Sequence, residues 1–409
     1  MIEKKFPEGF LWGAATASYQ VEGGIENTDW AKAAREGKVP PCGRACDFYN
    51  RYEEDFDIAK SLGHNCHRIS IEWARIEPEE GKFDEKEVEH YRKVITAMRE
   101  RRLKPFITLW HFTLPQWFAD KGGFEHPDAP EIFARYCGYV ARKFGNDCRH
   151  FATLNEPNVF SAGGWLSGKW PPFKKWPQID GLKIPGPRPR YDARPTVSWK
   201  NVPQYFSVLN ALARAHNAAY DAIKAAAFGA EVGIVYQIIY FHANRNPFNK
   251  LLAAFLNWHW TYRFLGKVHT KCDSIGVNYY HHKKFGDTTT YEKTDMGWDV
   301  YPEGLCEALK MVRRYGKPVW VSEAGVADAT DRIRADYVKR LIRCMHIAIE
   351  KGVDLRGYMY WSLLDNYEWA DGFEKRFGLV EIDFETLERK IRPSAYVYKE
   401  IIERNALID

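Results

Sequence analysis

Two glutamates, Glu156 and Glu323, follow short apolar runs typical of strands, and Trp, His and Asn residues lie at the ends of the other strand-like runs. Paired carboxyl groups cleave acetals: one protonates the leaving oxygen, and the other, ionised, attacks the anomeric carbon. Their pKa values must differ, so their surroundings must differ too. Arg68 and the Tyr280 hydroxyl are candidates to keep Glu323 charged. Glu156 has no cation close to it in sequence, which makes it the better proton donor.

A single glutamate at a strand end is usually a solvated rim residue, so this hypothesis depends on the pair and its neighbours. The ends of the other strand-like runs carry carboxylates, amides and indoles. They show no Ser/His/Asp order, no clustered histidines for a metal and no phosphate-binding loop. The carboxylate pair is therefore the leading candidate for chemistry.

Eight apolar runs alternate with longer segments whose apolar residues recur about every 3.6 positions. The runs predict strands at residues 10–18, 67–73, 105–110, 151–155, 232–240, 274–280, 318–323 and 358–364. The longer segments predict helices at residues 52–62, 86–101, 130–144, 203–227, 248–265, 303–315, 332–351 and 393–404. Continuous apolar runs suit parallel strands covered on both faces. Eight strand–helix repeats predict an α/β fold, a single (β/α)8 TIM barrel forming one catalytic domain over residues 1–409.

The competing architecture is a doubly wound open sheet. It usually carries a glycine-rich turn after an early strand, and no G-x-G-x-x-G occurs here. In a (β/α)8 barrel the reacting groups come from the C-terminal ends of the strands. The ends of the fourth and seventh runs, which carry Glu156 and Glu323, would therefore point into one basin.

Composition bounds the remaining possibilities. Of 409 residues, 45% are hydrophobic and 28% are charged, so the chain can bury a large core and is not disordered. A formal net charge of +5 is too small to indicate a nucleic-acid partner. No run of about 18 or more apolar residues is present to span a membrane, and the N-terminus lacks the pattern of a secretory signal. We therefore expect a cytoplasmic protein with no membrane partner.

The eight cysteines are scattered, which suits reduced thiols in a cytosol. Cys42, Cys46, His64, Cys66 and His67 are residue types that ligate zinc. No second closely spaced cysteine pair follows them, so buried free thiols are the favoured interpretation and we expect no metal site.

The fifteen tryptophans exceed what packing alone requires, and indoles stack well on flat apolar ligand faces. A long loop insertion at about residues 163–200 contains Trp165, Trp170, Trp176 and Trp199. It is either a solvated loop or a wall of the substrate cleft. Trp110, at a strand tip, is expected in the sugar pocket or its floor, and Trp298 is a further candidate for the cleft. The tryptophans expected mainly to pack are Trp12, Trp73, Trp258, Trp260 and Trp320.

Several ordered motifs run along the chain. They are residues 10–23 (FLWGAATASYQVEG), 67–71 (HRISI), 110–111 (WH), 153–158 (TLNEPN), 276–280 (GVNYY), 361–369 (WSLLDNYEW) and 376–380 (RFGLV). Together they resemble glycoside hydrolase family 1, the family of β-glucosidases and β-galactosidases, over nearly the whole length. Residues 370–398 look most like the archaeal-type β-glycosidases of that family. The resemblance implies an exo-acting, retaining β-glycosidase for β-glucosides, with β-galactosides and β-fucosides close behind.

The resemblance also implies the role of each site residue. Glu156 would be the acid/base and Glu323 the nucleophile, with their carboxyl groups about 5–5.5 Å apart. The implied sugar-binding residues are Gln20, His111, Asn155, Asn278, Tyr280, Trp361, Glu368 and Trp369. Arg68 and Phe377 would support them.

Three positions sharpen the substrate that the resemblance implies. Relatives that cleave 6-phosphoglycosides carry Ser in place of Glu368 and Tyr in place of Phe377, so unphosphorylated sugars are expected here. Plant thioglucosidases carry Gln in place of Glu156, so ordinary O-glycosides are expected. The expected partner is a small β-glycoside or oligosaccharide, without any cofactor, and the chain is a possible homo-oligomer.

The chain departs from the family pattern at Ala324, where Asn usually follows the nucleophile. Alanine cannot hydrogen bond through its side chain, so one support of Glu323 would be missing. Two alternatives remain open. One is a β-glycosidase that transfers the sugar to an alcohol or sugar, and the other is a catalytically weak sugar-binding barrel. The presence of both glutamates argues against the second.

Overall fold

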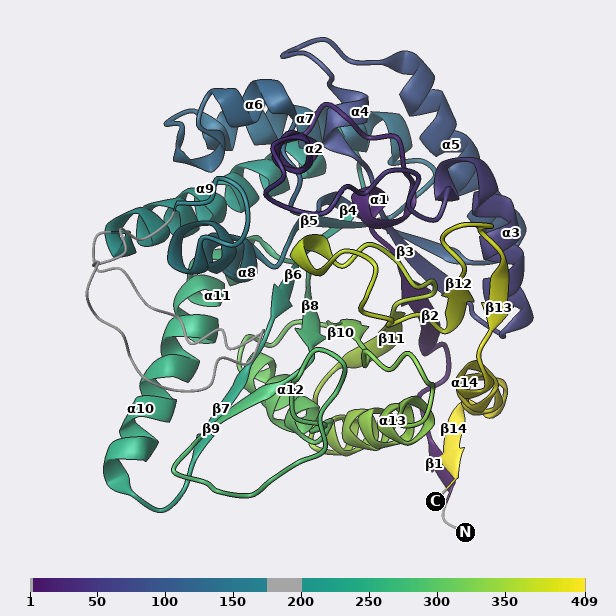
Figure 1. The fold of residues 1–409 in the computed structure, drawn as a ribbon, viewed down its shortest axis with the longest axis vertical. Coiled ribbons are helices and arrows are strands. Elements are labelled where there is room, and N and C mark those ends of the chain that lie inside the picture. Colours follow the sequence, from purple (N-terminus) through teal and green to yellow (C-terminus); the bar gives the residue numbers. More distant parts are fainter. Residues whose placement is uncertain (1–2, 175–200, 409) are drawn as a thin grey trace.

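The computed structural model describes residues 3–174 and 201–408. Eight parallel strands close into a barrel in the order β10–β11–β2–β3–β4–β5–β6–β8 (Figure 1). They are β2 (Leu11–Ala15), β3 (Cys66–Ser70), β4 (Lys104–Trp110), β5 (His150–Asn155), β6 (Glu231–Gln237), β8 (Ser274–Tyr279), β10 (Val319–Ala324) and β11 (Leu355–Trp361). Each overlaps one predicted run, which confirms the (β/α)8 barrel.

Helices surround the barrel (Figure 1). The longer ones are α3 (Phe48–Ser61), α5 (Glu85–Glu100), α7 (Ala129–Phe144), α9 (Val202–Ala226), α10 (Pro247–Asn257), α12 (Gly304–Arg313), α13 (Arg334–Glu350) and α14 (Pro393–Arg404). Each overlaps a predicted helix. The fifth predicted helix is divided, because a π-helical turn, η3 (Trp258–Tyr262), separates α10 from α11 (Arg263–Val268).

Shorter elements decorate the barrel ends. The short helices are α1 (Ser18–Val21), α2 (Asp29–Arg35), α4 (Trp73–Ile76), α6 (Gln116–Asp120), η1 (Gly123–Glu125), α8 (Pro157–Ser161), η2 (Ala162–Ser167), η4 (His269–Lys271) and η5 (Trp369–Asp371). Among the described residues, three strand pairs lie outside the barrel: β1 (Glu3–Lys5) with β14 (Ala406–Ile408), β7 (Tyr240–Ala243) with β9 (His282–Phe285), and β12 (Val380–Ile382) with β13 (Arg389–Ile391).

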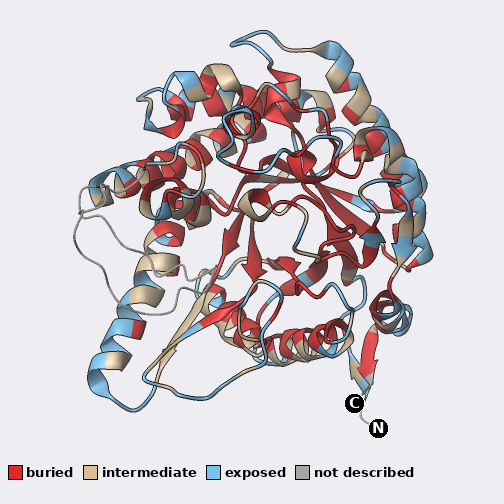
Figure 2. Ribbon diagram, in the orientation of Figure 1, coloured by how far each residue is buried: buried red, intermediate tan, exposed pale blue. Residues whose placement is uncertain are grey.

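The core fills the barrel and the layer between its strands and the helices (Figure 2). The strands are buried almost throughout because side chains cover both of their faces. Most of the longer helices bury one stripe, as α7 does with Phe133, Tyr136 and Val140. Among the described residues, no helix is both long enough and apolar enough to cross a membrane.

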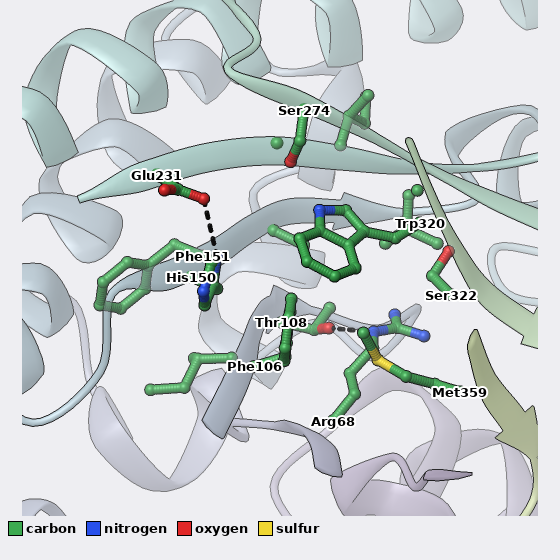
Figure 3. Close-up of a pocket in the computed structure, with 16 residues that line it drawn as sticks. Arg68, Phe106, Thr108, His150, Phe151, Glu231, Ser274, Trp320, Ser322 and Met359 are labelled. Carbon is green, nitrogen blue, oxygen red and sulfur yellow. Dashed lines mark hydrogen bonds and ion pairs between the residues drawn. The ribbon is translucent and has the colours of Figure 1, made fainter. Parts of the chain in front are cut away.

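Inside the barrel, side chains close around a cavity of about 30 Å³ (Figure 3). The rings of Phe106 and Trp320 meet there at 4.9 Å. Arg68 also lines this cavity, and its Nε donates to the Thr108 hydroxyl at 2.8 Å. The barrel is thus a packed core that anchors the base of the Arg68 guanidinium.

Candidate active site

A pocket of about 150 Å³ lies at the C-terminal ends of the barrel strands. Ten of the twelve predicted site residues line it: Gln20, His111, Asn155, Glu156, Tyr280, Glu323, Trp361, Glu368, Trp369 and Phe377. The other two, Arg68 and Asn278, lie behind the wall and donate hydrogen bonds to residues in it. The barrel therefore brings together residues that are far apart in the sequence.

The backbone is irregular where both glutamates leave their strands. The pairing of β5 with β6 shifts register between Ala152 and Asn155, and that of β10 with β8 shifts between Val321 and Glu323. Such bulges re-aim side chains near active sites. Glu156 then takes a left-handed conformation, with φ of 45°, at the start of α8. Backbone strain of this kind collects at functional sites.

Glu323 is contacted by two donors, one on each carboxylate oxygen. Its Oε1 is paired with the Arg68 guanidinium, and both side chains are almost fully buried. Its Oε2 accepts a hydrogen bond from the Tyr280 hydroxyl at 2.6 Å. Burial and the neighbouring Glu323 charge raise the pKa of Tyr280 well above its usual value, so this hydroxyl stays a donor. The two contacts predicted to keep Glu323 charged are both present.

Glu156 lies in a different environment. Its Oε1 accepts one hydrogen bond, from Asn278 Nδ2 at 2.8 Å, and Asn278 is in turn fixed by Ser322, whose hydroxyl donates to it at 2.8 Å. Burial, followed by the nearby Glu323 charge, raises the pKa of Glu156 well above its usual value. One carboxyl group therefore retains its proton next to another that is paired with a guanidinium, the separation of roles that acetal cleavage requires.

The hydrogen bonds around Asn155 assign the His111 tautomer. Arg68 Nη2 donates to Asn155 Oδ1 at 2.7 Å, so Asn155 Nδ2 faces His111 Nε2, at 3.2 Å. An amide nitrogen only donates, so His111 Nε2 accepts and the ring proton is on Nδ1. Burial lowers the pKa of His111 well below its usual value, which keeps the ring neutral.

Three buried polar atoms of the pocket residues find no partner among the described residues. They are the Oε1 atoms of Gln20 and Gln237 and the Nδ1 of His111. One is therefore a donor and two are acceptors. Buried polar groups are normally satisfied, so this set points to a ligand that carries several hydroxyl groups.

Glu368 adds a third carboxyl group to the wall. Burial, followed by the charge of Asp371, raises the pKa of Glu368 to about 8. Asp371 also lines the pocket, whereas no Lys or Arg among the described residues does so. This wall is suited to neutral hydroxyl donors and not to an anionic group.

Aromatic rings form the rest of the wall. The His111 ring lies nearly parallel to Trp361 and Trp369, with centroids 5.9 and 6.1 Å away. Trp170, in the insertion, lines the pocket, so part of the insertion does form a cleft wall; Trp298, from another loop, lines the pocket as well. Trp298 is 4.8 Å from the ring of His281, which stacks on it.

Several tryptophan predictions need correction. Trp110 is buried beneath the pocket and not in its lining, because its Nε1 donates to the Thr113 carbonyl and its ring packs on Phe160. Trp165 is likewise buried against Phe160. Trp258 was expected to pack but is 49% exposed. Trp176 and Trp199, with the remainder of the insertion over residues 175–200, lie outside the described residues.

Five pocket residues were not predicted: Phe112, Val159, Gln237, Met296 and Asp371. Gln237 ends a barrel strand and Asp371 follows Glu368 by three residues, so their positions were available as signals. Nothing in the local sequence marked Met296, which lies in a loop between β9 and α12.

The structure shows the cysteines as reduced thiols. All eight cysteines are free, and Cys42 and Cys46 donate to the carbonyl oxygens of Tyr19 and Asp365. The described residues contain no group of three or more His, Cys, Asp or Glu placed to hold a metal ion.

Ala324 has no polar side chain, but its backbone carbonyl accepts a hydrogen bond from the Tyr358 hydroxyl at 2.8 Å.

Comparison with known proteins decides the family. The sequence matches the model of the family Glycosyl hydrolase family 1 over residues 2–274 and 267–407. The chain belongs to glycosyl hydrolase family 1. Within this family it is 32% identical to β-glucosidase A of Thermotoga maritima, an alignment that covers all of both chains, and 29% identical to a β-galactosidase of Pyrococcus woesei, with 98% of each covered. The solved β-glycosidase of Pyrococcus horikoshii superposes with a TM-score of 0.88 at 35% identity, covering 100% of this chain and 97% of that one.

As a family 1 glycosyl hydrolase, the protein is a glycosidase whose substrate is a β-glycoside. The alignment with the Thermotoga maritima enzyme extends over 476 positions, whereas the chain has 409 residues. That relative therefore has segments that this chain lacks.

Proposed function

We propose that the protein is a retaining exo-β-glycosidase that hydrolyses terminal, non-reducing β-D-glucosyl residues, and also β-galactosyl and β-fucosyl residues, with residues 1–409 acting as one catalytic domain. The observation that carries the proposal is the contrast between its two central carboxyl groups. Glu323 is paired with Arg68 and Tyr280, whereas Glu156 is buried with a raised pKa and one amide donor.

In the first step, Glu156 donates its proton to the glycosidic oxygen while Glu323 attacks the anomeric carbon. The bond to the leaving group breaks, and a glycosyl ester forms on Glu323. Burial, and after it the Glu323 charge, raises the pKa of Glu156; once the ester forms, the Glu323 charge is gone, so the pKa falls and the Glu156 carboxylate can act as a base. It takes a proton from water, which attacks the anomeric carbon from the opposite face and releases the sugar with its configuration retained.

Recognition of the sugar is proposed for the inner wall. The unpartnered acceptor of Gln20 and donor of His111 would bind ring hydroxyl groups. Glu368, with a pKa of about 8, can accept from or donate to hydroxyl groups 4 and 6 in either epimer. The indoles of Trp361 and Trp369 give the apolar face of the ring a surface to lie on.

An unphosphorylated sugar is proposed, for two reasons. The wall contains four carboxyl groups, those of Glu156, Glu323, Glu368 and Asp371. It contains no Lys or Arg among the described residues to pair with a phosphate.

The test replaces Glu323 with glycine and supplies azide with an activated aryl β-glucoside. Glu323→Gly should abolish hydrolysis, and azide in the vacated space should give an α-glycosyl azide, identified by NMR. A β-glycosyl azide would reverse the two assignments. The matched variant, Glu156→Ala, should slow substrates with poor leaving groups far more than activated aryl glycosides.

Transfer to an acceptor other than water is the second candidate. Trp170, Met296 and Trp298 give the pocket an apolar outer wall, which favours an alcohol or sugar acceptor. Product analysis with added alcohol separates the two, because transfer yields an alkyl β-glycoside in addition to free sugar.

A further inference from the structure

Helix α10 presents an apolar face to solvent. Phe248 is 81% exposed and Leu251 70% exposed, and Leu252, Phe255 and Trp258 are exposed as well. In Figure 1, α10 projects from the barrel beside β7 and β9, and Figure 2 shows it mostly exposed. The two other large exposed hydrophobic side chains of the described residues, Phe228 and Tyr396, stand alone in sequence, whereas these five lie close together. We call these five residues the α10 face.

The spacing of these residues makes the face continuous. Positions 248, 251, 252, 255 and 258 share one side of a helix that turns about 100° per residue. Ala253, the one fully buried residue of α10, lies on the opposite side. The helix is therefore attached by one side, with the end of α10 tied to β7 by Asn257, whose amide donates to the Phe241 carbonyl at 2.8 Å. The apolar side is left without cover from the described residues.

The surroundings of the α10 face are cationic. Between Glu231 and Asp273 the sequence contains five Lys or Arg residues and no Asp or Glu. Arg245 and Lys250, at the start of α10, are exposed and make no ion pair with any described residue. The closest acid along β9 is Asp287, which follows Gly286 and accepts hydrogen bonds from Thr289.

We propose that the α10 face docks on a bilayer surface rich in anionic lipid headgroups. A helix with Phe, Leu and Trp on one side and Lys or Arg at its flanks lies in the interfacial plane, with its apolar side among the acyl chains. The cations add attraction to anionic headgroups. This contact requires no membrane-spanning segment.

A second copy of the chain fits less well. An eleven-residue helix is roughly 16 Å long, so its exposed side offers on the order of 200 Å², against about 800 Å² per partner in a standard interface. A two-fold contact would also bring the Arg245 and Lys250 groups of both copies together. A lipid surface avoids both difficulties.

Docking would also place the substrate pocket close to the bilayer. Gln237, in the pocket wall, ends β6, and β7 begins three residues later and packs against α10. The α10 face is thus connected to the catalytic end of the barrel and not to its N-terminal end.

Cosedimentation with vesicles tests the proposal. The protein should bind vesicles of phosphatidylcholine with 30 mol% phosphatidylglycerol about tenfold or more tightly than vesicles of phosphatidylcholine alone, and added salt should reduce the difference. Phe248→Ser/Leu251→Ser should weaken binding to the mixed vesicles about a hundredfold. Arg245→Gln/Lys250→Gln should weaken it about tenfold. All variants should hydrolyse a soluble aryl β-glucoside normally, which shows that they fold.

Matched controls exist elsewhere on the surface. Phe228→Ser removes another fully exposed aromatic side chain, after the end of α9, and Lys86→Gln/Lys93→Gln removes two exposed charges on α5. Neither should change vesicle binding. Absence of binding by the unmodified protein, or equal binding to both vesicle types, would overturn the proposal. A dimer in lipid-free buffer that Phe248→Ser/Leu251→Ser dissociates would assign the α10 face to a second copy instead.

Discussion

The inner end and the outer wall of the pocket are built on different principles. At the inner end, Arg68, Asn155 and Asn278 link both glutamates through buried hydrogen bonds. These bonds are directional, so they fix the orientation of each side chain. The outer wall consists of Trp170, Met296 and Trp298, which contact their neighbours mainly through rings and apolar atoms. Directional hydrogen bonds thus hold the inner end, whereas apolar packing holds the outer wall.

This difference predicts where each kind of substitution acts. Directional networks lose most of their energy when one member is removed, because the remaining partners are left buried and unsatisfied. Apolar walls lose only contact area. Changes at the inner end should therefore affect the chemical step, and changes at the outer wall should affect which aglycone binds.

The largest effect is expected for Arg68→Met. It leaves the Glu323 carboxylate buried without its cation, a loss that costs about 3–5 kcal/mol when a buried pair is broken. We expect a fall in kcat of about a thousandfold or more and a lower midpoint of urea unfolding. Arg92→Met is the control, since Arg92 pairs with Asp147 at the surface; it should cost about 1 kcal/mol or less. Equal losses in both variants would contradict the distinction between directional and surface pairs.

A smaller effect is expected for Glu368→Gln, read from the pH profile of kcat/KM. Glu156 must carry its proton, so activity falls as pH rises through the pKa of Glu156. Burial and Glu323 contribute most to raising that pKa, and Glu368 adds to them. Glu368 has a pKa of about 8 and is charged above that pH; removing this charge should lower the pKa of Glu156 and move the basic limb to lower pH by less than about one unit. Asp371→Asn is the control and should leave the basic limb in place. A shift of the basic limb to higher pH in Glu368→Gln would contradict the assignment.

The smallest effect is expected for Trp298→Ala in the outer wall. Loss of ring contact should raise KM for aryl β-glucosides about threefold to tenfold and leave kcat nearly unchanged. Methyl β-glucoside, whose aglycone is too small to reach the ring, is the control substrate and should show no change. A large loss of kcat would place Trp298 with the inner end.

The sequence predicted the inner end better than the outer wall. Barrel geometry requires strand ends to converge, so Glu156 and Glu323 could be placed together from the pattern of strands alone. Met296 could not, since it lies in a loop whose path to the pocket no periodicity in the sequence indicates. Trp110 was misplaced because its backbone position at a strand end does not reveal that its ring turns into the core.

The α10 face shows the same limit in another form. Its apolar spacing correctly predicted a helix, and Trp258 was assigned to packing on that basis. A helical pattern gives the side on which apolar residues lie but not the direction in which that side points. In α10 the apolar side points away from the barrel. We expected no membrane partner because the sequence has no spanning segment, but that argument says nothing about docking on a membrane surface.

The left-handed backbone at Glu156 has an evolutionary consequence. Glycine and asparagine adopt this conformation at little cost, and neither would bury a carboxyl group beside Glu323. Retaining glutamate at position 156 therefore lowers folding stability, and only selection for turnover can maintain it. A descendant lineage freed from that selection should drift toward glycine or asparagine there, becoming more stable as it becomes inactive.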